Sequence, residues 1–435
     1  MAAPVEGSSP WRRRIGIVLA LVVVLIVGGL YLVLIADGIY GNGGKQLTTL
    51  SPHGSESQKI QTLITPVFAI AGVVLVLVFG AVLSFCMKYR DRGDDADEFP
   101  VQRHGSTPLE IGWTVLPALI LLVVAIFTVA TIVSLNRTTK NALKVEVSGQ
   151  QWWWAFHYDM NNDGKFTDTA HGDIITATEL IIPIHREVDL TITSQDVIHS
   201  FWIPALNGKK DAVPGQHHPL ILEANKLGVY RGQCTQFCGL SHANMRMLVR
   251  VVSEADFARW VANQQKASVE PTTDVAKAGQ KVFEQQLCSS CHLIRGVNDD
   301  KISVKWGGKA PGGGTAADQQ VSGVAPDLTH IATRGTFAGS IYNLYTPDDP
   351  ADPGHPGNAA IVADPGDPGN ALYGGDSAPF TWNVTGLSAW LRNPPLMKPM
   401  YAGPLVPAKD RRGMPNLHLT ELQITQLVAY LETLR

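Results

Sequence analysis

The sequence predicts a multidomain protein in which membrane-spanning helices precede an all-β domain and then an all-α domain. Three observations carry this prediction. Long apolar runs are confined to the residues before position 135. Short alternating or β-branched segments fill residues 140–267, and a helical pattern with a second pair of cysteines fills residues 272–435. With 435 residues, the chain is also too long for one typical domain.

Residues 1–135 are predicted to be a membrane anchor. Apolar runs at 63–86 and 111–133 are each long enough, at roughly 20 residues, to cross a bilayer as a helix. A further run at 15–35 follows the basic sequence W-R-R-R, so it is either a third span or a signal peptide. Its length and the lack of a clear cleavage site favour a retained span. The basic loop 88–104 is then cytoplasmic by the positive-inside rule, and the later domains lie outside the cytoplasm.

Residues 140–267 are predicted to form a β-sandwich or barrel. Segments such as K-V-E-V-S-G-Q at 144–150 and E-V-D-L-T-I-T-S at 187–194 alternate or are β-branched, with turn residues between them. Three adjacent tryptophans within 151–158 must point to both faces of a strand, so we expect at least one to face outward. The segment 159–168 resembles a calcium loop but lacks its bidentate glutamate, which makes an N-D-G turn the better interpretation.

One stretch of this β region, C-T-Q-F-C-G-L-S-H-A-N-M at 234–245, has the composition of a metal-binding loop. It holds two thiols, an imidazole and a thioether at short spacings, and His199 would bring a second imidazole from a neighbouring strand. Soft sulfur ligands joined by imidazole favour copper, whereas a closed set of cysteine and histidine without methionine would favour zinc. A disulfide and a zinc loop are the competing interpretations. The side chains concerned are Cys234, Cys238, His242 and Met245.

A second motif with metal chemistry follows a linker near Pro271. An amphipathic stretch at 274–287 leads into C-S-S-C-H. In an exported chain this pattern indicates covalent attachment of a c-type haem, in which Cys288 and Cys291 add to the porphyrin vinyl groups and His292 ligates the iron. A disulfide or a zinc site is again the alternative.

The rest of the C-terminal region supplies a closing helix at 420–434 and three candidates for the sixth iron ligand, Met397, Met400 and Met414. Methionine ligation raises the haem potential, which suits delivery of electrons to copper. Residues 346–375 contain a near repeat rich in proline, glycine and aspartate. Such a composition cannot bury a core and predicts a surface excursion.

The 234–245 stretch resembles the binuclear copper loop, called CuA, of cytochrome c oxidase subunit II. The family pattern C-x-E-x-C-G-x-x-H-x-x-M, with a distant histidine, is matched at every position but one, where this chain has Gln236. Relatives carry a glutamate there that also reaches a magnesium ion, and an amide lacks the charge, so magnesium binding is doubtful. With this loop, the β region resembles a cupredoxin domain. The resemblance implies two copper ions bridged by Cys234 and Cys238, capped by His199 and His242, weakly bound by Met245, and contacted by the backbone carbonyl of Gln236.

The same resemblance assigns roles to three other residues. Trp152 corresponds to the exposed tryptophan through which electrons enter, and Trp154 to the one packed beneath the metal. Glu110 lies where relatives carry a glutamate at the mouth of a proton-uptake channel into subunit I. An acid at this position is equally well explained as a solvated charge favoured by the helix dipole, and both interpretations stay open.

The C-terminal region resembles a class I cytochrome c domain. The family's ligand loop ends in M-P-N-L just before the last helix, which implies that Met414 is the axial ligand and that Met397 and Met400 are packing residues. In A-P-D-L-T-H at 325–330, the resemblance implies that the carbonyl of Pro326 orients the ligating imidazole. His330 is expected to be a surface residue.

Together, these resemblances imply subunit II of a bacterial caa-type haem-copper oxidase with a cytochrome c domain fused to its C-terminus. Such a chain passes electrons from one covalently bound haem c to two coppers and on to subunit I. Oxygen is reduced to water there, coupled to proton translocation. The chain would be an oxidoreductase and translocase only as part of that complex, because no residue that reacts with oxygen lies in it.

Expected partners are subunit I and other oxidase subunits, an upstream cytochrome or quinol-oxidising complex, and membrane lipid. A net charge of −3 gives no basis for nucleic-acid binding. We expect a multi-pass protein of the bacterial plasma membrane with its copper and haem domains on the extracytoplasmic side. The alternatives are a membrane-anchored haem c/CuA carrier that feeds a nitric or nitrous oxide reductase, and a copper-handling binding protein.

Overall fold

The computed structural model describes nine stretches of the chain. The predicted apolar run at 15–35 and the near repeat at 351–371 lie outside them. The described residues fall into two compact units, the first comprising 58–134 and the second 47–57 with the residues after 134. The described residues are 47–90, 105–136, 141–164, 166, 172–286, 288–298, 325–347, 380–401 and 412–435.

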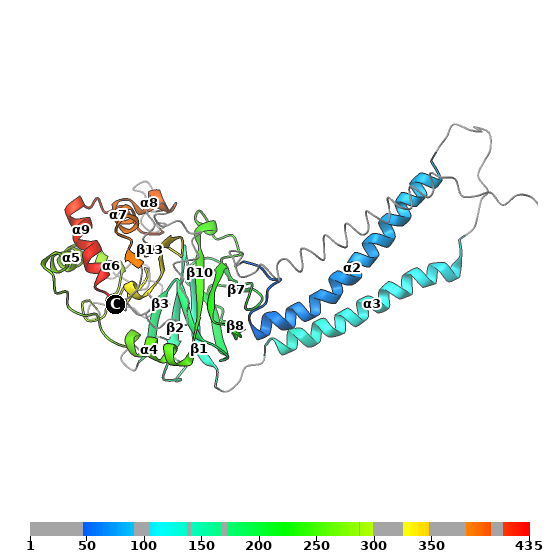
Figure 1. The fold of residues 1–435 in the computed structure, drawn as a ribbon, viewed down its shortest axis with the longest axis horizontal. Helices are drawn as coiled ribbons and strands as arrows, with labels where there is room; N and C mark the ends of the chain where they lie inside the picture. The colour runs from blue at the N-terminus through cyan, green and yellow to red at the C-terminus, as the bar shows by residue number, and fades with distance from the viewer. Residues whose placement is uncertain are drawn as a thin grey trace, which may run out of the picture. The chain divides into compact units, whose positions relative to one another are not determined.

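Two long helices, α2 (Ser55–Lys88) and α3 (Thr107–Ser134), contain the predicted spans at 63–86 and 111–133 (Figure 1). Each has an 18-residue window with a mean hydropathy of 2.8 that is not buried inside the chain. At 34 and 28 residues, both helices exceed the ~20 residues that a bilayer crossing requires. The prediction of two apolar N-terminal helices is therefore confirmed.

The β region forms a sandwich, as predicted. A five-stranded sheet has the order β3-β2-β1-β5-β8, a three-stranded sheet has the order β4-β10-β9, and β6 pairs with β7. Strand β1 runs antiparallel to β2 and parallel to β5. One apolar core contains side chains from both larger sheets. The strands are β1 (Leu143–Gln150), β2 (Trp153–Asp159), β3 (Ile174–Ala177), β4 (Glu179–Pro183), β5 (Val188–Ser194), β6 (His199–Phe201), β7 (Lys210–Ala212), β8 (His218–Leu222), β9 (Gly228–Gln233) and β10 (Arg246–Val252).

Helix α4 (Glu254–Gln264) closes the sandwich. It begins after Ser253, whose side chain accepts a hydrogen bond from the backbone of Asp256, a typical N-cap. Trp260 packs on Tyr158 of β2 with ring centroids 5.1 Å apart. The carboxylate of Asp159 holds the short turn after β2, because it accepts hydrogen bonds from the backbone amides of Asp163 and Gly164.

The C-terminal region has a second, separate core. Its helices are accompanied by two short two-stranded sheets, so the expected all-α domain also carries strands. Helices α5 and α9 cross closely at Gly279, where a Cβ atom would lie 2.0 Å from the carbonyl oxygen of Gln426. The elements are α5 (Asp274–Gln285), α6 (Cys288–Cys291), β11 (Thr336–Phe337), β12 (Tyr342–Asn343), β13 (Tyr345–Pro347), β14 (Phe380–Trp382), α7 (Val384–Arg392), α8 (Pro394–Met397) and α9 (Glu421–Glu432).

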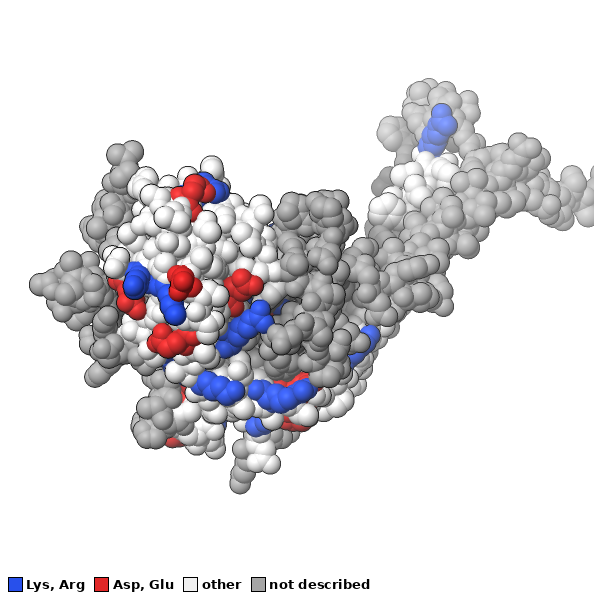
Figure 2. Space-filling view, turned by 60° about the vertical axis from the view of Figure 1, so that its left-hand side comes forward, with Lys and Arg blue, Asp and Glu red and all other residues white. Residues whose placement is uncertain are grey.

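Charged side chains are mixed on the face that Figure 2 shows. Lysine and arginine side chains lie close to aspartate and glutamate side chains there, among a larger area of other residues. This distribution agrees with a net charge close to zero.

Candidate metal centre

The predicted metal loop connects two neighbouring antiparallel strands, β9 and β10. The backbone amide of Cys234 donates to the carbonyl of Met245 at 2.9 Å, which closes the loop at its base. The next amide, of Thr235, donates to Ser200 of β6 at 3.0 Å. The loop is therefore fixed beside the strand that begins with His199.

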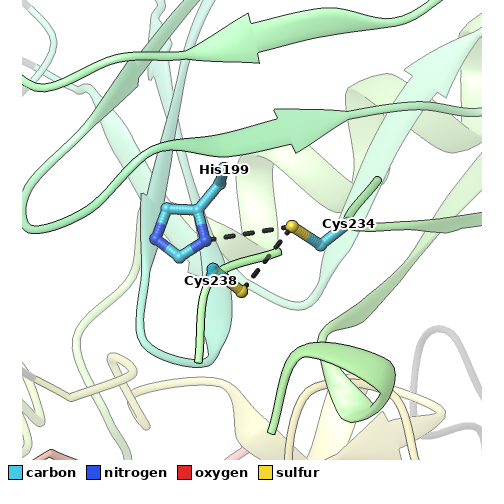
Figure 3. Close-up of side chains that lie close together, drawn as sticks. All are labelled: His199, Cys234 and Cys238. Carbon is cyan, nitrogen blue, oxygen red and sulfur yellow. Dashed lines mark hydrogen bonds between the residues drawn. The ribbon is translucent and has the colours of Figure 1, made fainter. Parts of the chain in front are cut away.

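Three predicted ligands lie together in the sandwich (Figure 3). The Sγ atoms of Cys234 and Cys238 are 3.8 Å apart, and Nδ1 of His199 is 3.9 Å from Sγ of Cys234. All three residues are buried, and their candidate ligand atoms lie within 4.8 Å of one another. Both cysteines are free thiols in this structure.

The other three predicted ligands surround the same two sulfurs. Nδ1 of His242 lies 3.5 Å, and Sδ of Met245 3.8 Å, from Sγ of Cys238. The carbonyl oxygen of Gln236 is 3.2 Å from Sγ of Cys234. The fold thus gathers all six predicted donors.

This donor set fits a pair of copper ions better than one zinc ion. A structural zinc site takes four ligands in a tetrahedron, whereas here four further donors flank the two cysteine sulfurs, six donors in all. Two thiols, two imidazoles and a thioether are the soft and borderline ligands that copper favours.

Burial and mutual contact shift the pKa of the donors. Hydrogen bonding to Cys238 lowers the pKa of Cys234, and the same contact raises the pKa of Cys238, because the two sulfurs share a proton. Burial opposes ionisation of His199, but hydrogen bonds to Asp196 and Cys234 outweigh it and raise the His199 pKa. Of the two thiols, Cys234 is therefore the one that ionises more readily.

Asp196 is a supporting residue that the sequence alone did not reveal. Its Oδ1 lies 2.9 Å from Nε2 of His199 and also accepts a hydrogen bond from the backbone amide of Val197. Its Oδ2 accepts a hydrogen bond from the backbone amide of Gln151 at 2.8 Å. The imidazole is thereby oriented with Nδ1 toward Cys234. The only signal in the sequence is an acid three residues before the histidine.

The expectation of an outward-facing tryptophan is wrong. Trp152 is only 2% exposed, and Trp153 and Trp154 are also buried. Its Nε1 donates to the carbonyl of Cys238 at 3.0 Å, and its ring lies 5.5 Å from that of Tyr401, between centroids. The C-terminal region covers the ring, which the spacing of the β region could not reveal. Trp154 packs edge-on against the ring of His199 at 5.9 Å.

The haem motif lies on one helical turn. Cys288 and Cys291 begin and end α6, and the His292 amide donates to the Cys288 carbonyl at 2.9 Å. Nδ1 of His292 is 2.8 Å from the carbonyl oxygen of Pro326, the partner that the resemblance implied. A ring that donates from Nδ1 leaves Nε2 available to a metal. Burial raises the pKa of the Cys288 thiol to about 11.

The remaining predicted residues are spread over the chain. Met414 packs against the second core, and Met400 packs against the first. Glu110 is exposed in the first turn of α3. The expectation that His330 is a surface residue is wrong. It is 2% exposed, and its two ring nitrogens lie 2.9 and 3.0 Å from the carbonyls of Arg435 and Lys266.

Comparison with known proteins gives two family matches. Residues 143–252 match "Cytochrome C oxidase subunit II, periplasmic domain", and residues 48–131 match "Cytochrome C oxidase subunit II, transmembrane domain". Cytochrome c oxidase subunit 2 of Alkalihalophilus pseudofirmus is 33% identical over 307 residues, which are 69% of this chain and 80% of that protein. The proteins of the same name from Bacillus sp. PS3 and Bacillus subtilis are 32% and 30% identical, over 58% and 61% of this chain and 72% and 76% of theirs.

Proposed function

Because the chain belongs to the cytochrome c oxidase subunit II family, we propose that its 234–245 loop holds the binuclear copper centre of the subunit. Members of this family are the subunits through which electrons enter the oxidase. The chain is accordingly part of an oxidoreductase complex, is anchored in the membrane with a periplasmic domain, and has subunit I among its partners.

The proposed copper ligands are the six donors gathered by β6 and the β9–β10 loop. The observation that carries this assignment is the pair of sulfurs 3.8 Å apart, with an imidazole beside each. Cys234 and Cys238 would hold both ions between them, and His199 and His242 would each supply an imidazole ligand. The thioether of Met245 and the carbonyl of Gln236 would complete the set, and no magnesium contact is assigned to Gln236.

For the C-terminal region, 272–435, we propose a covalently attached haem c. Cys288 and Cys291 form the thioether links, and the iron ligands are His292 and Met414. The turn that α6 makes between the two thiols supports this assignment, as does the contact of His292 with Pro326, because it fixes the imidazole and frees its other nitrogen.

The proposed job of the chain is to position two one-electron carriers. Haem and copper supply the redox chemistry when they are bound. The residues supply rigid ligands: the strands hold His199 and the ends of the copper loop, so little has to move when an electron arrives. Fusing the donor domain, 272–435, to the copper domain, 140–267, raises the donor's effective concentration.

The membrane part completes the proposal. Helices α2 and α3 cross the bilayer, and the chain is multi-pass, with both metal domains on the extracytoplasmic side. Glu110, in the first turn of α3, is the candidate for proton uptake toward subunit I. A quinol-oxidising complex or another cytochrome supplies the electrons.

Purification of the native complex from detergent-solubilised membranes tests the proposal. We expect a large haem a-containing subunit to co-purify, and two coppers per chain with purple absorbance and a multi-line paramagnetic signal. Zinc or no metal in the wild-type protein would overturn the copper assignment. Co-purification with a nitric or nitrous oxide reductase would overturn the oxidase assignment.

The haem assignment has a test of its own. We expect haem to stay attached to the chain after denaturation, and a Met414→Leu variant to lose the six-coordinate spectrum of the wild type. Met397→Leu is the matched control, since the hydrogen bonds of Met397 are made by its backbone: its amide donates to the Asn393 carbonyl at 3.4 Å, and its carbonyl accepts from the hydroxyl of Tyr342 at 2.7 Å. A normal six-coordinate spectrum in Met414→Leu would show that another residue ligates the iron.

A further inference from the structure

A short segment of the C-terminal region, Lys398–Tyr401, lies directly on the copper loop. The ring of Tyr401 packs on that of Trp152 in a tilted arrangement, with centroids 5.5 Å apart and an angle of 49° between the planes. The carbonyl of Pro399 accepts a hydrogen bond from the hydroxyl of Ser241, which lies between two proposed copper ligands. This segment therefore covers the tryptophan that contacts the carbonyl of Cys238.

Lys398 fastens the segment in place. Its ammonium group is buried and donates to the carbonyl of Trp152 at 2.6 Å and to the carbonyl of Ala338 at 2.9 Å. Burial lowers the pKa of Lys398 to about 7, against an opposing effect of the Cys238 charge. The charged form has three N–H donors and the neutral amine has two, so both can make the two hydrogen bonds. The lysine thus joins the backbone beside the copper loop to the C-terminal region in either form.

The other end of the segment meets the proposed axial ligand of the haem. Sδ of Met400 accepts a hydrogen bond from the backbone amide of Met414 at 3.2 Å. A Cβ atom at Gly413 would lie 2.1 Å from the same sulfur, and Gly413 has φ +89°, so this close approach depends on glycine. Met400 itself packs against the core of the sandwich, whereas Met414 packs against the C-terminal core.

We propose that Lys398–Tyr401 is a built-in electron bridge, running from the Met414 loop through Met400 and Tyr401 to Trp152 and the copper loop. The inference rests on the proposed function and adds the route within the chain. One electron leaves the haem iron, which goes from ferrous to ferric, and one electron reduces the copper pair. No proton moves, and no bond forms or breaks.

The bridge has a consequence for the choice of donor. Trp152 is 2% exposed beneath Tyr401, so a free cytochrome cannot place its haem edge on that ring while the segment is seated. Electrons that reach the copper loop through Trp152 then enter at the C-terminal domain. The buried tryptophan thereby selects the tethered donor over a soluble one.

The test is single-turnover electron transfer in the purified complex. A flash-activated photoreductant injects one electron into the haem, and the absorbance of the copper centre reports its arrival. We expect Tyr401→Ala and Lys398→Met to slow electron transfer from haem to copper several-fold. The first variant removes the ring that packs against Trp152, and the second removes the two hydrogen bonds that hold the segment in place. Tyr401 is 41% exposed, so its truncation leaves the core intact.

Two variants serve as controls. Tyr401→Phe keeps the ring and should transfer at the wild-type rate. Leu396→Ala changes a side chain on the preceding helix that is 79% exposed, and should also have no effect. Haem and copper spectra identical to the wild type are required of every variant, so a slower rate reports the route and not loss of a cofactor.

Wild-type transfer rates in both Tyr401→Ala and Lys398→Met would overturn the bridge while leaving the proposed function intact. If the wild-type protein carried no covalent haem, its absorbance spectrum would show this before any rate is measured. That result would overturn the haem assignment and the bridge together. The two failures are therefore distinguishable.

Discussion

The carboxylate of Asp196 sets the direction in which His199 presents its imidazole. It contacts Nε2 at 2.9 Å and is itself held by two backbone amides, so the ring has one orientation, with Nδ1 toward Cys234. Carboxylates behind metal-bound histidines also increase the basicity of the ligand. The orientation of the His199 ring in the site therefore depends on Asp196 as well as on His199 itself.

We expect Asp196→Asn to weaken copper binding by about 10- to 100-fold, the usual effect of changing such a partner. The amide has the same shape but lacks the charge that raises the pKa of His199. Competition with a chelator of known affinity measures the change. Asp189→Asn, on the neighbouring strand β5, is the control, and equal affinities in the two variants would contradict this role for Asp196.

At the residue scale, the sequence predicts which side chains are metal donors better than it predicts which residues are buried around them. The spacing of Cys234, Cys238, His242 and Met245 sufficed because one short loop carries them all. The burial of Trp152 and His330 could not be predicted, since the groups that cover them are distant in sequence: Tyr401 for Trp152, and Lys266 and Arg435 for His330.

Helices α5 and α9 depend on one glycine where they cross. The Gln426 carbonyl approaches Gly279 so closely that a Cβ atom would lie 2.0 Å from it. We expect Gly279→Ala to separate the helices and to reduce the free energy of unfolding of the C-terminal region by about 1–3 kcal/mol, the typical cost of overpacking.

Thermal unfolding, followed by far-ultraviolet circular dichroism, measures the effect of Gly279→Ala. Lys281→Ala, exposed on the same helix, is the control and should be neutral. Unchanged stability of Gly279→Ala would mean that the helices can move apart without loss of packing.

A buried ion pair joins strands β4 and β10 to the C-terminal region. Nε of Arg250 donates to Oε2 of Glu179 at 2.7 Å, and Oε1 accepts the amide of Gly335 and the hydroxyl of Thr336 at 2.9 and 2.8 Å. Removing one partner leaves a buried charge without compensation. We expect Arg250→Leu to reduce the free energy of unfolding by about 3–5 kcal/mol.

Arg259→Leu is the matched control for Arg250→Leu. Its ion pair with Asp256 has the arginine 55% exposed, and such surface pairs contribute about 1 kcal/mol at most. Urea unfolding monitored by tryptophan fluorescence compares the two variants. Similar losses of unfolding free energy in both variants would show that the buried ion pair contributes no more to stability than the surface pair.

Elements with a clear period were predictable, and the others were not. The alternation in K-V-E-V-S-G-Q became β1, and the amphipathic stretch after residue 273 became α5. Strands β11 and β12 have two residues each, too few for a period, so the C-terminal region was expected to be all-α.

At the scale of the whole molecule, copper binding and contact between the two domains should be coupled. The segment Lys398–Tyr401 touches Trp152 and Ser241 of the copper site, and the amide of Arg246, one residue after Met245, donates to the carbonyl of Gly339 at 3.1 Å. Copper that fixes the loop favours the arrangement in which these contacts form. By linkage, the contacts must then strengthen copper binding equally.

We therefore expect copper to increase the protection of the Arg246 amide against hydrogen exchange, relative to the copper-free protein. Lys398→Met should remove most of this gain, because the C-terminal segment loses its fastening. The Cys234 amide, bonded to Met245 within the loop, is the internal control and should gain protection in both proteins. If Arg246 responds to copper equally with and without Lys398, the metal stabilises only its own loop. The C-terminal region would then have no influence on copper binding.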